Sequence, residues 1–168
     1  MRFYYRAEYT NGQHCQAGQN WEWDAVKFQI LSPPTEPFSS ENDNSCVLQI
    51  STDKQRFLLT GDIEYNAEQS LVEQYGPQLH SNVLIAPHHG SKTSSSEVFL
   101  KQVAPQLILI PAGYFNRFHF PHSLVLERYQ KIGANWLNTA EQGAISLRST
   151  NEALKAVSER QNKQRYWT

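Results

Sequence analysis

The 168-residue sequence has few of the features that mark specialised classes of protein. It contains two cysteines, Cys15 and Cys46, in no metal-type spacing, which excludes a disulfide framework and leaves a single bridge open. It has no apolar run near the ~20 residues of a membrane helix. Its first residues also lack the apolar core of a signal peptide. We therefore expect the chain as given to be soluble.

The sequence also has almost no net charge. Fifteen basic residues oppose 16 acidic ones, so the net charge is −1. This balance gives no overall attraction to nucleic acid, and any phosphate contact has to be local. What the sequence does contain is 39% hydrophobic residues, which excludes a disordered chain and, at this length, predicts one domain with a real core.

Two short apolar runs are each followed by residues that carry chemistry. Phe57–Leu59 precedes Thr60-Gly61-Asp62, and Val83–Ala86 precedes Pro87-His88-His89-Gly90-Ser91. Both runs are too short for helices and are typical of buried strands. The segment between the two motifs fits one crossover helix over 65–75, so a carboxylate and two imidazoles should meet at one sheet edge.

Carboxylate oxygen and imidazole nitrogen form a ligand set that suits zinc or manganese. Taken alone, Gly61-Asp62 is more typical of a turn, and adjacent histidines can equally hydrogen-bond to backbone. The ordered combination favours a site. A further strand, 107–110, leads into a third group of polar side chains, namely Asn116, Arg117, His119 and His122. We therefore expect Asp62, His88, His89 and His122 to lie in one cleft.

The remaining pattern predicts elements around this centre. Strands are expected over 21–31, 46–50 and 144–147, and helices over 94–103, 123–132 and 152–164. Ser94 and Glu97 have capping-box spacing, so a helix should begin beside Ser91 and Lys92. The N-terminus of this helix is either a binding site for phosphate or an ordinary capped helix end. A hairpin is expected within 1–20, and Asn42–Ser45 is either a turn or a brace for the site.

Four motifs in this order, Asn42–Ser45, Leu58–Glu64, Pro87–Ser94 and Asn116–His122, resemble the C-terminal metallo-β-lactamase-like domain of ComEC-type DNA-uptake proteins. The resemblance covers roughly residues 15–148. It implies an α/β (α+β) fold of the four-layer αββα type, with 1–148 as its C-terminal portion and 149–168 as a helix or tail. For the parent protein it implies a hydrolase domain attached to a channel in the bacterial inner membrane that imports single-stranded DNA during natural transformation.

Two departures from that family pattern stand out. The first metal motif of the superfamily, His-x-His-x-Asp-His, is absent, since His14 is the only histidine before residue 80. The chain therefore resembles a partial domain, and the isolated chain is expected to bind metal weakly or not at all. The second departure is that His119-Phe120-Pro121-His122 stands where the family often has Gly-His-Pro-His.

The first functional interpretation is a metal-dependent phosphodiesterase or nuclease that uses zinc or manganese in the full-length domain. Asp62 and His88 would be metal ligands, and His89 or His122 would contact the scissile phosphate or protonate the leaving oxygen. Substrate contacts would come from Ser91, Lys92, Asn116, Arg117 and His119. A metal-bound hydroxide would be the nucleophile.

Two alternatives remain open. The chain could be a non-catalytic module that binds DNA or docks on the channel part of its parent, which the missing histidine motif favours. It could also be a small-molecule hydrolase of the same fold. In either case a sandwich cut near its middle should expose an apolar sheet face or self-associate to cover it.

Overall fold

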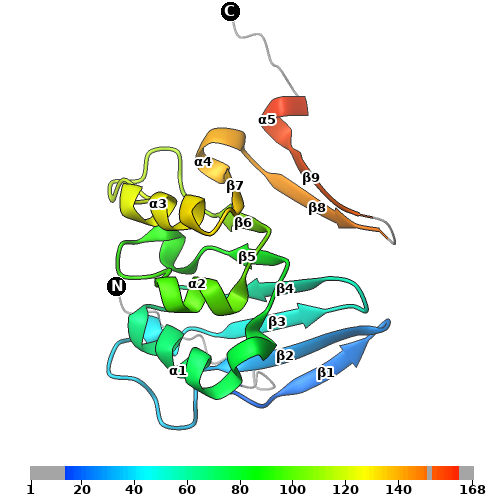
Figure 1. Ribbon diagram of the computed structural model, residues 1–168, viewed down its shortest axis with the longest axis vertical. Coiled ribbons are helices and arrows are strands. Elements are labelled where there is room, and N and C mark those ends of the chain that lie inside the picture. Colours follow the sequence, from blue (N-terminus) through cyan, green and yellow to red (C-terminus); the bar gives the residue numbers. More distant parts are fainter. Residues whose placement is uncertain (1–13, 151–152, 163–168) are drawn as a thin grey trace, which may run out of the picture.

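The computed structural model describes residues 14–150 and 153–162 and is built on one mixed seven-stranded sheet (Figure 1). Its strands follow each other in chain order: β1 (Asn20–Trp23), β2 (Val26–Ser32), β3 (Val47–Ser51), β4 (Arg56–Leu59), β5 (Val83–Ile85), β6 (Leu107–Ile110) and β7 (Asn135–Asn138). Neighbours from β1 to β4 are antiparallel, whereas β4 to β7 are parallel. A separate antiparallel pair contains β8 (Ile145–Ser149) and β9 (Leu154–Ser158).

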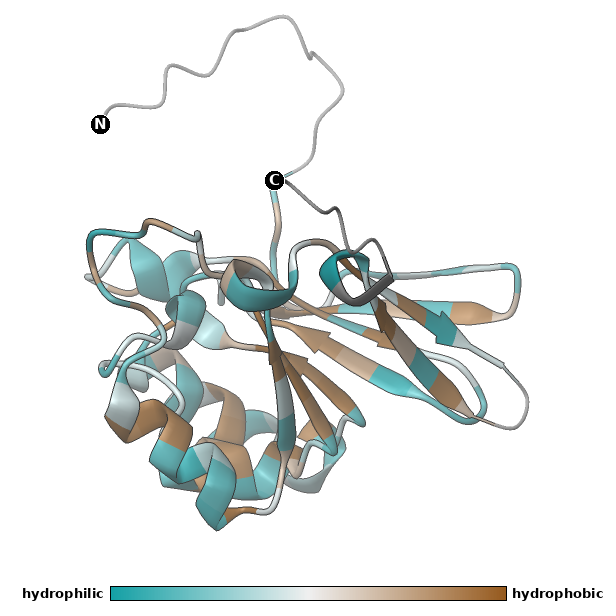
Figure 2. Cartoon of the chain, turned by 90° about the horizontal axis from the view of Figure 1, so that it is seen from above, coloured by the Kyte–Doolittle hydropathy of each residue, from teal (hydrophilic) through white to brown (hydrophobic). Residues whose placement is uncertain are grey.

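Three helices cover one face of the sheet: α1 (Tyr65–Tyr75), α2 (Glu97–Val103) and α3 (Ser123–Lys131) (Figures 1 and 2). Their inward side chains, among them Leu71, Phe99 and Tyr129, form one buried cluster with Leu58 of β4 and Ile108 of β6. Two one-turn helices, α4 (Thr139–Gln142) and α5 (Glu159–Asn162), flank the β8–β9 pair in the chain. The expectation of a mixed α/β fold is confirmed, and the four-layer sandwich stays a prediction.

None of the helices among the described residues is long and apolar enough to cross a bilayer.

The face of the sheet opposite the three helices is almost entirely apolar. The strand register places these side chains on it together: Phe28, Ile30, Leu48, Ile50, Phe57, Leu59, Val83, Ile85, Leu107, Leu109 and Leu137. Ile30 and Val83 are buried, and the others remain partly exposed. Figure 2 shows the hydrophobic colouring running through the central strands. We call this surface the open sheet face.

Several expected elements differ from those observed. The helix expected over 152–164 is wrong, because Leu154–Ser158 is strand β9 and only Glu159–Asn162 is helical. The expected domain limit at residue 148 falls inside β8. The expected strand 21–31 is two antiparallel strands that turn at Asp24 and Ala25, both of which have positive φ. Strand β7 was not expected, and the hairpin proposed around Asn11-Gly12 lies largely outside the described residues.

The two cysteines form a disulfide between Cys15 and Cys46, which decides the alternative that the sequence left open. The bridge spans 31 positions and ties the segment before β1 to the start of β3. The same segment is also held by a hydrogen bond from the Ala17 amide to the Pro33 carbonyl. Because such bonds persist in oxidising compartments, we expect this part of the chain to face one.

A buried carboxylate fixes the loop between the histidine motif and α2. Glu68 of α1 is fully buried and accepts hydrogen bonds from the amides of Ser95 and Ser96, the latter at 2.7 Å. Arg128 Nη1 donates to the Ser94 carbonyl at 2.8 Å, and the hydroxyls of Ser95 and Tyr129 lie 2.8 Å apart. Burial raises the pKa of Glu68, an effect that the hydrogen bonds to Ser96 and Ser95 and the nearby Arg128 only partly offset.

Replacing Glu68 by alanine is expected to lower the free energy of unfolding by roughly 3 kcal/mol, because two buried amides lose their acceptor. The ionised form is disfavoured in the folded state, so the pKa of Glu68 is higher there than in the unfolded chain. Its contribution to stability is therefore full below the unfolded-state pKa and is lost as pH rises through the folded-state pKa. Denaturant titrations over pH, with Glu68→Gln as the non-titrating control, measure both effects. A wild-type-minus-Gln difference that does not change with pH would contradict the assignment.

Candidate functional site

Three loops that follow the parallel strands β4, β5 and β6 converge at one edge of the sheet. They bring Asp62, His88 and His89 to the lining of one cavity of about 380 Å³, which Asn116 and Phe118 also line. The expected clustering is therefore observed for Asp62, His88 and His89, whereas His122, which is expected in the same cleft, is not among the lining side chains. The clustering arises because the carboxyl ends of parallel neighbours meet at the same sheet edge. The catalytic and metal-binding roles assigned to these residues stay predictions.

The side chains of His89 and Asp62 form a polar pair in the lining of the cavity. His89 Nε2 lies 3.4 Å from Asp62 Oδ1, and both side chains are a little under half exposed. His89 Nδ1 lies 2.8 Å from the carbonyl oxygen of Pro111, which can only accept, so Nδ1 carries the proton. In the neutral ring this leaves the Nε2 lone pair directed at the side where Asp62 lies.

His88 belongs to a second polar pair. Its Nδ1 lies 3.2 Å from Glu64 Oε1, and the same oxygen accepts a 2.6 Å hydrogen bond from Thr93 Oγ1. Glu64 is not among the residues that the sequence motifs predict for the site. Its position in the sequence could have indicated this role. Ile63, between Asp62 and Glu64, is buried, so the two carboxylates flank one buried residue in the same short segment.

The histidine turn has an unusual backbone. His88 and His89 are both in the left-handed region, with φ of 46° and 55°. Non-glycine residues rarely adopt this conformation, and adjacent pairs of them occur where surrounding contacts enforce it. Here the His88 amide donates to the Gly61 carbonyl at 3.0 Å and the Ser91 amide donates to the His88 carbonyl at 2.9 Å. The turn is thereby fixed onto the loop that carries Asp62.

The Asn42–Ser45 cluster braces the site from behind, which is one of the two alternatives considered for it. Ser45 Oγ accepts from the Asp62 amide at 3.1 Å. Buried Asp43 accepts from the Glu64 amide at 2.8 Å and from the Ala67 amide at 3.3 Å, and the second bond satisfies an amide in the first turn of α1. The backbone on both sides of Asp62 is therefore held by side chains from one segment.

Of the two alternatives for the start of the second helix, a binding site for phosphate or an ordinary capped end, the structure favours the capped end. The helix begins at Glu97 with Ser96 as N-cap, not at Ser94, whose hydroxyl instead donates to the Pro87 carbonyl. The amides of Ser95 and Ser96 donate to Glu68 and are not available for a ligand. Ser91 is buried with its hydroxyl 2.9 Å from that of Thr93, whereas Lys92 is exposed.

The residues expected in the third loop have different surroundings. Asn116 uses its side chain within the loop, donating to the carbonyls of Gly113 and Phe120 and accepting from the Phe120 amide. Arg117 lies over the Phe118 ring, and His119 is exposed. His122 is near the histidine turn through its amide, which donates to the Gly90 carbonyl, but its ring caps α3 and is not among the cavity-lining side chains.

Within residues 14–150 and 153–162, no group of three or more histidine, cysteine, aspartate or glutamate side chains is arranged to hold a metal ion. Asp62 and His89 could supply two metal ligands, and a stable zinc site usually has three or four protein ligands. The cavity can thus supply part of a metal site.

No family model matches the chain. It is 38% identical over 148 residues to Competence protein ComA of Neisseria gonorrhoeae, 38% over 141 residues to Recombination protein 2 of Haemophilus influenzae, and 37% over 126 residues to ComE operon protein 3 of Bacillus subtilis. These alignments cover 88%, 84% and 75% of this chain, and 21%, 18% and 16% of the respective relatives. The chain therefore spans about a fifth of the length of the relatives it matches.

Proposed function

Because this chain is homologous to one segment of the ComEC-type competence proteins, we propose that it acts in DNA uptake as part of a metal-dependent phosphodiesterase or nuclease site of a longer protein. The substrate is single-stranded DNA or a related phosphodiester. The other part of the longer protein contributes the membrane channel in the bacterial inner membrane, and this segment lies on the oxidising side, in keeping with its disulfide.

The observation that carries the proposal is the geometry of Asp62 and His89. Two ligands of one tetrahedral ion, each about 2.1 Å from it, lie about 3.4 Å apart. Asp62 Oδ1 and His89 Nε2 have this separation, at 3.4 Å. In addition, metal-binding histidines typically donate their other ring N–H to a carbonyl or carboxylate, as His89 does to Pro111. His89, rather than His88, is thus the better ligand partner for Asp62.

The remaining side chains then have roles that follow from their contacts. A bound zinc or manganese ion would supply Lewis acidity and an activated water. Glu64 Oε1 lies 3.2 Å from Nδ1 of His88, so a His88 ring that is protonated at both nitrogens can keep this contact and give its Nε2 proton to a leaving oxygen. Lys92 and Arg117 provide local positive charge for phosphate in a chain that is otherwise nearly neutral.

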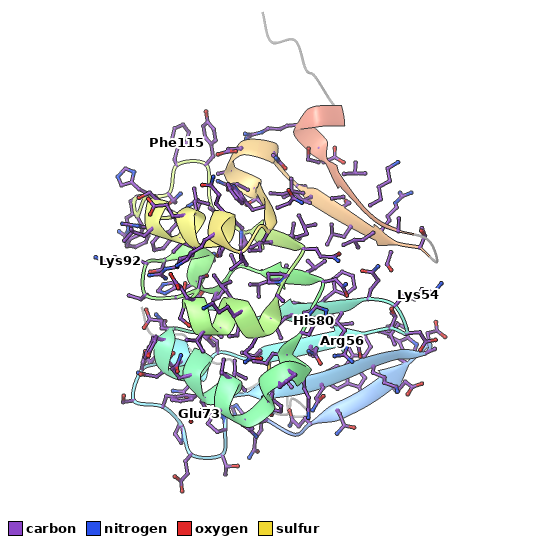
Figure 3. The ribbon with its side chains drawn as sticks, viewed as in Figure 1. Lys54, Arg56, Glu73, His80, Lys92 and Phe115 are labelled. Atoms are coloured by element: carbon purple, nitrogen blue, oxygen red, sulfur yellow. A yellow bond between two sulfur atoms is a disulfide. The ribbon has the colours of Figure 1, made fainter. Side chains whose placement is uncertain are left out.

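Metal titration of the 168-residue chain tests where the ligands are. We expect zinc or manganese affinity weaker than micromolar, because only two protein ligands are present. Asp62→Asn and His89→Ala should each weaken this binding further. His80→Ala is the matched control, since exposed His80 precedes β5 at the opposite end of that strand (Figure 3).

Calorimetry distinguishes the outcomes of that titration. Sub-micromolar affinity with one or two ions per chain would contradict an incomplete site. Equal binding by wild type, Asp62→Asn and His89→Ala would contradict the location of the ligands.

A second candidate function is a non-catalytic binding module. It is favoured by the two-ligand site, which is incomplete within the described residues. Retained binding of single-stranded DNA without metal, together with no hydrolysis by the longer protein, would support this module instead. A lactone and a phosphodiester dye, tested beside single-stranded DNA, separate the nuclease from a small-molecule hydrolase of the same fold.

A further inference from the structure

The loop from Gly113 to Pro121 exposes an unusual number of aromatic side chains next to the cavity. Phe115 is 92% exposed, Tyr114 65% and Phe118 59%. Figure 3 shows Phe115 projecting from the loop between β6 and α3. Large exposed aromatics that are grouped in this way on a soluble surface mark an interaction site.

The aromatic side chains form a row that leads from the cavity to solvent. At the cavity end, the rings of His88 and Phe120 make a T-shaped contact with their centroids 5.7 Å apart. Phe120 stacks on Phe118 at 5.5 Å with the rings 20° from parallel, and the Arg117 guanidinium lies 4.8 Å from the Phe118 centroid. The row therefore ends in a guanidinium beside an aromatic ring.

A second group lies beside this row. Tyr114 and Phe115 contact each other with centroids 4.5 Å apart, and the Arg160 guanidinium lies 5.1 Å from the Tyr114 centroid. Arg160 is held in turn by hydrogen bonds to the carbonyls of Ala140 and Glu141. Phe115 thus stands on a fixed neighbour with most of its own ring open to solvent.

The loop is ordered before any ligand arrives. The Asn116 side chain donates to the carbonyls of Gly113 and Phe120 at 2.9 Å each and accepts from the Phe120 amide at 2.6 Å. These bonds close the loop on itself and set the positions of Phe118 and Phe120. In a preorganised loop, binding of a ligand loses less free energy to the ordering of side chains.

We propose that this loop, the aromatic platform (Tyr114, Phe115, Arg117, Phe118 and Phe120), stacks the unpaired bases of a single-stranded nucleic acid and leads its backbone to the cavity. The proposal deepens the function proposed above and rests on it for the identity of the chemistry at the cavity. Aromatic faces with interleaved arginines are how proteins hold single strands without reading their sequence. Bases stacked inside a duplex cannot reach such a platform, so it selects single strands.

Charge alone does not account for this surface. The chain has a net charge of −1, and the cavity end of the row carries the carboxylates of Asp62 and Glu64. Two arginines beside the rings supply local positive charge without a basic patch. Stacking on the aromatic rings is therefore the main source of affinity in this proposal. An oligonucleotide without bases should consequently bind much more weakly than a normal one.

Binding of a labelled oligothymidylate to the 168-residue chain is the test, measured by fluorescence anisotropy without metal. Phe115→Ala and Phe118→Ala are each expected to weaken binding roughly five-fold or more. Phe115→Trp should retain it, and Trp23→Ala, which removes a 72% exposed aromatic on β1, should leave it unchanged. An abasic oligonucleotide of equal length and a blunt duplex should bind wild type as weakly as the oligothymidylate binds Phe115→Ala.

The outcomes separate this inference from the proposed function. Equal binding of the normal and abasic strands, no binding of any oligonucleotide, or no effect of Phe115→Ala and Phe118→Ala overturns the platform, whether or not the longer protein hydrolyses DNA. Loss of binding in Phe115→Ala and Phe118→Ala, rescued by Phe115→Trp, supports it even if no hydrolysis is found. Hydrolysis by the longer protein is measured separately, through its loss in Asp62→Asn.

Discussion

Replacing Gly90 by alanine is expected to force the histidine turn away from the loop that carries the aromatic platform and to destabilise the fold by roughly 2–5 kcal/mol. An added Cβ would lie 2.7 Å from Pro121 Cβ and 3.1 Å from Pro121 Cα, closer than carbon atoms approach without movement. Gly90 also has φ of +82°, which an alanine adopts only with strain. Both effects act at the point where the Gly90 carbonyl accepts from the His122 amide.

Gly133→Ala is the matched control for that substitution. Gly133 has a similar φ of +71°, but an added Cβ would meet nothing within 4 Å. It therefore reports the conformational part of the effect alone. Denaturant unfolding of both variants separates the two parts, and we expect Gly90→Ala to lose about 1–3 kcal/mol more than Gly133→Ala. Equal losses would show that the turn and the loop are not in tight contact.

The 168-residue chain by itself is expected to self-associate or to bind a hydrophobic dye strongly. The open sheet face presents apolar side chains from six neighbouring strands, most of them partly exposed. Surfaces of this kind larger than a few hundred Å² are rare on soluble monomers. Trp21 and Phe28, whose rings stack at 5.0 Å, extend the apolar surface to the β1 edge.

Light scattering and dye fluorescence measure this directly. We expect a dimer or larger species, and we expect Leu107→Lys with Leu109→Lys, which places two charges on the open sheet face, to shift it toward monomer. Lys101→Glu, at an exposed position of α2, is the control for a change of charge on the helix side. A wild-type chain that runs as a clean monomer with low dye binding and a sharp thermal transition would contradict the partial-domain interpretation.

The parts of the site that follow from strand ends could be predicted from the sequence. Short apolar runs place Asp62, His88 and His89 after parallel strands, and that alone brings them to one cavity. Helix α1 was also predictable, since its apolar residues recur at helical spacing and its bounds are Tyr65 and Tyr75. In these segments local pattern and tertiary burial agree.

The elements and contacts that the sequence did not predict depend on residues that are distant in the chain. Residues 154–158 contain good helix formers, yet they pair with β8 as a strand, because tertiary pairing outweighs weak local propensity. Strand β7 was missed because Asn135 and Asn138 flank only two apolar residues. The carbonyl of Pro111 that fixes the proton of His89 leaves no sign in the sequence, and the self-bonded side chain of Asn116 leaves none either.

The most direct test of the central claim is hydrolysis of single-stranded DNA by a purified soluble region of the longer protein that contains this segment. We expect cleavage that requires zinc or manganese and falls by about 100-fold or more in Asp62→Asn, while His80→Ala cleaves like wild type. Absence of metal-dependent cleavage, or cleavage that Asp62→Asn leaves unchanged, would contradict the claim.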